Sequence, residues 1–127
     1  MQSGKAPGYS GIPIEFFKSA PRICIDMLKS LFNSVLSTGI YPPEWTYGVI
    51  IPIYKKGNVN DPANYRPITL LEVSGKIFSK ILCNRLTLWA EREHFITPEQ
   101  AGFRHGFQTH DNIFILNSII QRYLSLY

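Results

Sequence analysis

In the stretch YGVIIPIYKKGNVNDPANYRPITLL, residues 47–71, the helical spacing of apolar residues gives way to a strand-like pattern, and the fold class depends on this change. Residues 47–54 are β-branched and aromatic, as is typical of a strand, and Pro52 favours a sheet edge or a bulge. Residues 55–64 are polar and rich in Gly, Asn, Asp and Pro, which predicts a turn or hairpin loop. Residues 66–71 predict the returning strand. The whole stretch therefore predicts one β-hairpin.

The sequences on both sides of this hairpin predict helices. Pro13 is expected to start a short helix that stops before Pro21, and apolar residues at three- and four-residue spacing then predict a longer helix that ends at Gly39. Ser74 is expected to cap a long helix, and Thr109 a last one. Their predicted apolar faces comprise Ile77, Phe78, Ile81, Leu82, Leu86 and Trp89 in the former and Ile113, Leu116, Ile120 and Tyr123 in the latter. The predicted class is α+β, mostly helical around one hairpin, and further strands are expected elsewhere because a two-stranded ribbon is marginal alone.

The composition excludes several classes of protein. The 127 residues carry 13 Lys and Arg against nine Asp and Glu, and the resulting net charge of +4 is a mild bias toward polyanions. A hydrophobic fraction of 45% excludes a wholly disordered chain. No run of about 18 apolar residues predicts a transmembrane helix, and the first residues lack the apolar region of a secretory signal. The sequence has only Cys24 and Cys83, so neither a disulfide scaffold nor a four-ligand zinc site is expected. A reducing compartment is expected instead.

No complete active site follows from the motifs. The sequence contains no Asp-Asp or Asp-x-Asp pair of the kind that holds two metal ions, no G-x-S-x-G and no phosphate-binding Walker loop. Asp26, Asp61 and Asp111 have ordinary interpretations as a solvated helix face, a turn former and a complement to a helix dipole.

The hairpin supplies the first candidate binding site. Lys55 and Lys56 end one predicted strand and Arg66 begins the next, so three cations are expected at one end of the hairpin. Such a cluster suits the oxygens of a phosphodiester or a triphosphate, and Tyr54 and Tyr65 beside it offer flat surfaces for a base. The alternative is a solubilising tip, because Lys commonly protects exposed strand edges.

A second candidate patch is formed by Gln100, Gly102, Phe103 and Arg104. Glycine allows a backbone to approach closely, and arginine contacts phosphate. The alternative is a corner between a helix and a loop, with Phe103 anchored in the core. Residues 97–100, Thr-Pro-Glu-Gln, have the pattern of a capping box, but the glycine that follows limits any helix there to one turn.

Several motifs occur in a fixed order along nearly the whole chain. They are GKAPG (4–8), GIP (11–13), EFFK (15–18), PEW (43–45), IPIYKKG (51–57), DPANYRPITLL (61–71), KIF (76–78), RL (85–86) and QAGFR (100–104), followed by Gly106, Thr109, Asp111 and Ile113-Phe114. This order resembles the N-terminal part of the reverse transcriptase domain of LINE-type (non-LTR) retrotransposons. The combination of NYRPI with QAGFR is far more specific than either motif alone.

The resemblance implies that residues 1–127 are the fingers portion of a right-hand polymerase fold, in an RNA-directed DNA polymerase of a mobile element. It implies that Lys55 or Lys56, together with Arg66, hold the triphosphate of the incoming deoxynucleotide. It also implies that the segment from Gln100 to Arg104 lies along the RNA template, which is paired with a DNA primer. The full-length enzyme is expected to use magnesium and to work inside the cell, in the nucleus or cytoplasm.

The resemblance further implies that the catalytic Asp segments of the palm, and the thumb, lie beyond Tyr127. The 127 residues alone are therefore expected to be inactive and to bind no cofactor. Two departures from the family pattern hint at a drifted copy: residues 8–12 read GYSGI where relatives have GPDGI, and Phe107-Gln108 replaces a basic residue followed by Ser. The alternatives are a stand-alone nucleic-acid-binding or interaction module and a non-functional remnant of a mobile element.

Overall fold

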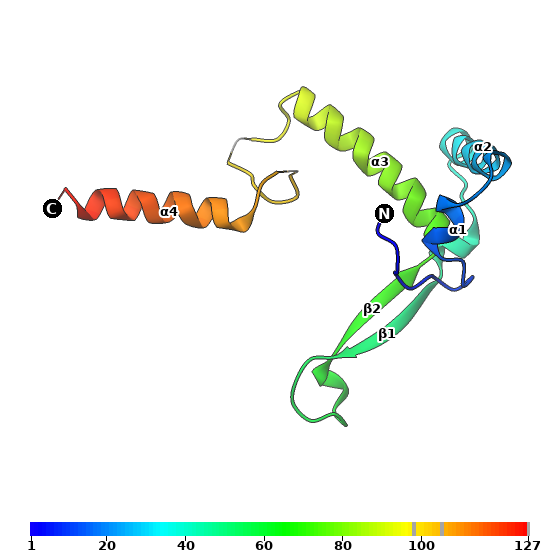
Figure 1. The fold of residues 1–127 in the computed structure, drawn as a ribbon, viewed down its shortest axis with the longest axis horizontal. Coiled ribbons are helices and arrows are strands. Elements are labelled where there is room, and N and C mark those ends of the chain that lie inside the picture. Colours follow the sequence, from blue (N-terminus) through cyan, green and yellow to red (C-terminus); the bar gives the residue numbers. More distant parts are fainter. Residues whose placement is uncertain (98, 105, 127) are drawn as a thin grey trace. The chain divides into compact units, whose positions relative to one another are not determined.

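The computed structural model describes residues 1–97, 99–104 and 106–126. It confirms the α+β class: the described residues form four α-helices, two short 3-10 helices and one two-stranded sheet (Figure 1). The chain divides into two compact units, Met1–Cys83 and Asn84–Tyr127. Helix α3 (Val73–Arg92) begins in the first unit and ends in the second, which also contains α4 (Thr109–Leu124). None of the helices in the described ranges is long and apolar enough to cross a membrane.

The first two helices begin and end where the sequence predicts. Helix α1 spans Ile14–Lys18 after Pro13, and α2 spans Arg22–Thr38 after Pro21. Gly39 ends α2 in the left-handed conformation, with φ of 71°, and its N–H donates to the carbonyl of Val35 at 2.9 Å. Glycine adopts this conformation without the steric cost that a side chain would add.

The predicted hairpin is also confirmed. Strand β1 (Gly48–Tyr54) pairs antiparallel with β2 (Tyr65–Leu71), and the 3-10 helix η2 (Pro62–Asn64) lies in the connecting loop. Just beyond the last residue pair of the strands, the Lys55 N–H donates to the Asn64 carbonyl at 2.8 Å. Hydrogen-bonded and non-hydrogen-bonded pairs alternate along an antiparallel sheet, so every second pair counted back from Lys55 and Asn64 is hydrogen-bonded. Pro52 and Pro67, which face each other, therefore occupy a pair that requires no N–H donor.

An aromatic cluster forms the core of the first unit. Phe32 of α2 lies 6.0 Å from Trp45 of the 3-10 helix η1 (Pro43–Thr46) and 5.3 Å from Phe78 of α3, measured between ring centroids. A Cβ atom on Gly75 would lie 3.1 Å from the indole Cγ of Trp45, so this glycine lets the indole pack directly on α3. The buried apolar residues are Ile14, Phe32, Val35 and Val73.

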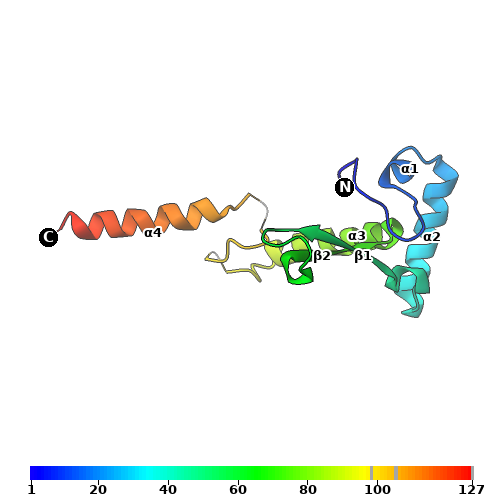
Figure 2. The same cartoon turned by 90° about the horizontal axis from the view of Figure 1, so that it is seen from below.

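The N-terminal segment is fastened where β2 meets α3, and both views show it passing the base of the hairpin (Figures 1 and 2). The Ser10 N–H and hydroxyl each donate to the carboxylate of Glu72 at 2.6 Å, and Glu72 is only 5% exposed. A Cβ atom on Gly8 would lie 2.6 Å from the Leu71 carbonyl oxygen, so only glycine fits there. The prediction that Ser74 caps α3 is wrong, because the helix begins one residue earlier, at Val73.

The predicted apolar faces of the last two helices are mostly exposed. Only the first turns of α3 meet the aromatic cluster, so Ile77 and Phe78 are half-buried while the remaining predicted residues of that helix are exposed. No described residue of α4 is buried. The predicted cap Thr109 is also wrong: Gln108 precedes the helix, and its N–H donates to the Asp111 carboxylate at 2.7 Å. Asp111 thus has the helix-terminal role that the sequence predicts for it.

The C-terminus of α3 is a Schellman motif. The Phe95 N–H donates to the Ala90 carbonyl at 2.8 Å, and the His94 N–H donates to the Glu91 carbonyl at 3.2 Å. The ring of Phe95 packs on Trp89 at a centroid distance of 5.2 Å, which is the apolar contact that usually accompanies this motif. His94 occupies the left-handed position, with φ of 52°, where glycine is usual.

Replacing His94 with Gly should stabilise the second unit by about 0.5–1 kcal/mol, because glycine removes the steric cost of a side chain at positive φ. Urea unfolding followed by hydrogen exchange of the amides in the last turn of α3 measures this gain. His94→Ala is the control and should give no gain. Equal stabilisation by both variants would contradict the backbone explanation.

Candidate functional site

The three predicted cations at the end of the hairpin are exposed. Lys55, Lys56 and Arg66 lie at or next to the strand ends, and none of them forms an ion pair with any other residue in the described ranges. Their charges are therefore available to an anionic ligand.

The strand register separates the two lysines. Arg66 pairs with Ile53, and Lys55 pairs with Asn64, so Lys55 and Arg66 are diagonal neighbours on one face of the ribbon. Diagonal neighbours lie roughly 7–8 Å apart, a distance that two long side chains can bridge around a phosphate. Lys56 lies in the bend that follows and does not share this pairing.

The two tyrosines beside the cations fasten the loop. The Tyr54 hydroxyl donates to the Gly57 carbonyl at 2.6 Å, and the Tyr65 hydroxyl donates to the Val59 carbonyl at 2.8 Å. The two rings meet edge to face at a centroid distance of 5.6 Å. Asp61 accepts from the Ala63 N–H at 3.0 Å, as its predicted role of turn former requires. The loop is thus held by its own hydrogen bonds.

Arg104 of the second candidate patch is engaged by protein groups on each nitrogen. Its Nε and Nη2 donate to the two carboxylate oxygens of Glu91 at 3.0 and 2.9 Å, and Nη1 donates to the carbonyls of Thr97 and Gln100 at 3.2 and 3.4 Å. The guanidinium also lies 4.5 Å from the ring centroid of Phe107, and the side chain is 13% exposed. The hydrogen bonds from Arg104 lower the pKa of Glu91, and the same bonds raise the pKa of Arg104.

The neighbouring residues of this patch face solvent. The Phe103 side chain is fully exposed, and its backbone is left-handed with φ of 63°, so the alternative that this ring is a core anchor is wrong. Residues 99–104 form turns and irregular structure between α3 and α4. Gln100 and Gly102 are exposed as well, and the space around Gly102 is open. Of the predicted capping box, Pro98 lies outside the described residues, and Glu99 and Gln100 are not helical.

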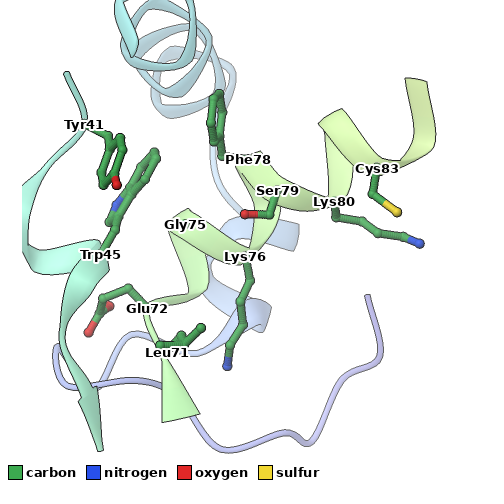
Figure 3. A pocket seen from close by; sticks show the side chains of 10 residues that line it. All are labelled: Tyr41, Trp45, Leu71, Glu72, Gly75, Lys76, Phe78, Ser79, Lys80 and Cys83. Atoms are coloured by element: carbon green, nitrogen blue, oxygen red, sulfur yellow. The ribbon is translucent and has the colours of Figure 1, made fainter. Parts of the chain in front are cut away.

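The first unit also contains a pocket of about 500 Å³ between η1 and α3, shown in Figure 3. Tyr41 stacks on Trp45 at one side, with ring centroids 6.5 Å apart and an angle of 13° between the rings. None of the predicted site residues lines it. In the three described ranges, no group of three or more His, Cys, Asp or Glu side chains is arranged to hold a metal ion.

Two charged residues with defined roles were missed by sequence reasoning. Glu72 stands alone between a predicted strand and a predicted helix, which was the available hint that it joins them. Glu91 has no such hint, because its partner Arg104 is 13 residues away across a loop.

Comparison with known proteins confirms the resemblance, although no family model matches the chain. The whole chain aligns at 34% identity with the probable RNA-directed DNA polymerase from transposon X-element of Drosophila melanogaster. At 36% identity, 80% of the chain aligns with the RNA-directed DNA polymerase from mobile element jockey of the same species. At 31% identity, 94% of it aligns with the transposon TX1 uncharacterized 149 kDa protein of Xenopus laevis.

The chain spans only a small part of these relatives: 14% of the X-element protein, 12% of the jockey protein and 9% of the TX1 protein. Further matches include a putative 115 kDa protein of the type-1 retrotransposable element R1DM. The homologues of this chain are therefore the RNA-directed DNA polymerases of LINE-type, non-LTR retrotransposons, and the chain is related to one segment of these much longer proteins.

Proposed function

We propose that the chain is the fingers portion of a right-hand polymerase, an RNA-directed DNA polymerase of a retrotransposon. It contributes contacts to the incoming deoxynucleotide triphosphate and to the RNA template, while the DNA primer and the catalytic magnesium are held mainly by palm and thumb segments elsewhere. The observation that carries this proposal is that Lys55 and Arg66 are exposed on one face of the hairpin and form no ion pair with the part of the chain that the structure describes, in a chain homologous to such polymerases.

In this role the hairpin end holds the triphosphate electrostatically. Arg66 supplies a planar fork that donates two hydrogen bonds to phosphate oxygens, and Lys55 supplies a mobile point charge. The hydrogen bonds of Tyr54 and Tyr65 hold the loop before ligand arrives, so less entropy is lost on binding. Gln100, Gly102, Phe103 and Arg104 belong to the segment that lies along the template.

Replacing Lys55, Lys56 and Arg66 together with Ala should flatten the plot of log K against log salt concentration by about 2–3 units for an RNA–DNA hybrid, if all three contact phosphates. The same variant should lose most of its affinity for a fluorescently labelled deoxynucleotide triphosphate at low salt. Fluorescence anisotropy measures both. Lys5, Lys29 and Lys80, replaced with Ala, form the control of equal charge change, since these exposed lysines lie outside the hairpin.

The single variants separate the two lysines. Because Lys55 shares a face with Arg66, Lys55→Ala should weaken triphosphate binding more than Lys56→Ala. Equal slopes of log K against log salt concentration for the triple variant and its charge-matched control would show that the hairpin end is only a solubilising tip. If the parent chain binds no triphosphate and the triple variant loses binding to the RNA–DNA hybrid, the result would favour the stand-alone nucleic-acid-binding module.

A further inference from the structure

We propose that Glu91 and Arg104 act as a positioning clamp that presents the ring of Phe103 to an unpaired nucleobase of single-stranded nucleic acid. This inference rests on the proposed function, since it names how the segment from Gln100 to Arg104 meets the template. It assigns the direct contact to Phe103 and an indirect role to the two charged residues.

The contacts of the clamp engage every nitrogen of the Arg104 guanidinium, so few hydrogen-bond donors remain for a ligand. Both carboxylate oxygens of Glu91 and two backbone carbonyls receive its hydrogen bonds, and its flat face covers the ring of Phe107. Glu91 lies in the last turn of α3, and its backbone carbonyl is one of the two acceptors in the Schellman motif that ends the helix. The clamp therefore ties a loop to a rigid helix end, which defines the position of the residues just before Arg104.

The backbone conformation of Phe103 is not explained by packing of its side chain. Its backbone is in the left-handed region, where a bulky side chain costs free energy, and its ring has no burial to offset that cost. Backbone outliers of this kind concentrate at functional sites, where surrounding contacts hold them. Here those contacts are the bonds of the adjacent Arg104. A fully exposed aromatic ring on a held loop is a stacking surface that any base can use.

Neutralising Glu91 tests the proposal, because the two possible roles of this residue predict opposite changes in binding affinity. If Glu91 only added negative charge near the nucleic acid, then Glu91→Gln would tighten binding, because it removes repulsion. If Glu91 holds Arg104, the same variant should weaken binding, because the neutral amide cannot replace a two-oxygen acceptor for the guanidinium.

The experiment measures binding of fluorescein-labelled octa-adenylate RNA to the 127-residue chain and its variants at fixed salt. Phe103→Ala is expected to weaken binding about tenfold, Phe103→Leu nearly as much, and Phe103→Trp little, because stacking requires a ring. Glu91→Gln is expected to weaken binding about threefold or more. The double variant Glu91→Arg with Arg104→Glu, which restores the pair in reverse, should recover much of that loss.

Glu93→Gln is the matched control, because Glu93 is two residues away and, among the described residues, forms its ion pair with exposed Arg92 at 2.9 Å. It should leave affinity unchanged or raise it slightly. Circular dichroism verifies that each variant retains its helices. Binding by Glu91→Gln as tight as that of the parent, or by Phe103→Ala as tight as that of the parent, would overturn the proposal.

The result is separable from that of the proposed function. Phe103→Ala and Glu91→Gln should leave deoxynucleotide triphosphate binding unchanged, because that is assigned to the hairpin of the other unit. If the triple alanine variant of Lys55, Lys56 and Arg66 (the hairpin variant) retains triphosphate binding while Phe103→Ala loses RNA binding, the hairpin assignment fails and the clamp stands. If the hairpin variant loses triphosphate binding while Phe103→Ala keeps RNA binding, the clamp fails alone.

Discussion

Phe32→Ala should destabilise the first unit by about 3–5 kcal/mol, which is the usual cost of removing a buried aromatic ring. The ring is 9% exposed and contacts both Trp45 and Phe78, so its loss leaves a cavity between α2, η1 and α3. Few other apolar side chains in this unit are buried, so little remains to compensate. Urea unfolding followed by Trp45 fluorescence in a Trp89→Phe background measures the effect.

The matched control is Ile23→Ala on the same helix, where the side chain is 69% exposed. It should change stability by no more than about 0.5 kcal/mol. Similar losses for Phe32→Ala and Ile23→Ala would mean that the aromatic cluster is not the core of this unit.

Ser10→Asp should cost about 2–4 kcal/mol, because it brings a second carboxylate against the buried carboxylate of Glu72 and removes a hydroxyl donor. The N-terminal segment should then detach from the junction of β2 and α3. Chemical unfolding and the rate of proteolysis within residues 1–13 report the two effects.

Two further variants define the cause of that loss. Ser10→Ala removes only one donor and should cost about 1 kcal/mol. Combining Ser10→Asp with Glu72→Gln should recover stability, because the amide can donate to the new carboxylate. If Ser10→Asp is as stable as the parent chain, the Ser10–Glu72 contact does not fasten the segment.

The Ser10–Glu72 contact also gives a physical reason for one departure from the family pattern. The resemblance places Asp in the GPDGI motif where this chain has Ser10. With Glu72 buried opposite this position, a hydroxyl donor fits and an acid does not. The change at Ser10 therefore suits the local contact with Glu72 and is not by itself a mark of decay.

Local structure was largely predictable from the sequence. The hairpin boundaries, the glycine that ends α2 and the helix-terminal role of Asp111 all depend on backbone preferences within a few residues. Caps were less predictable: Ser74 and Thr109 are good capping residues, but Ser74 is the second residue of α3 and Thr109 is the first residue of α4. Helix starts depend on tertiary contacts as well as on capping preference, and here Glu72 is held by Ser10.

The predicted burial of α3 failed for a different reason. Periodicity indicates which face of a helix is apolar, but only the presence of a partner decides whether that face is covered. In the described residues, the aromatic cluster meets only the first turns of α3, so Trp89 at the far end packs on Phe95 and remains 44% exposed.

The sequence by itself determined the α+β class, the hairpin with three cations at its end, and the relationship to retrotransposon polymerases. These depend on local preferences and on motif order, which a chain carries without being folded. Only the tertiary structure decided that Lys55 rather than Lys56 shares a face with Arg66, that Glu72 fastens the N-terminal segment, and that Arg104 binds Glu91 while Phe103 faces solvent. Each of these depends on residues far apart along the chain, and their contact becomes defined only when strand register and loop closure bring them together.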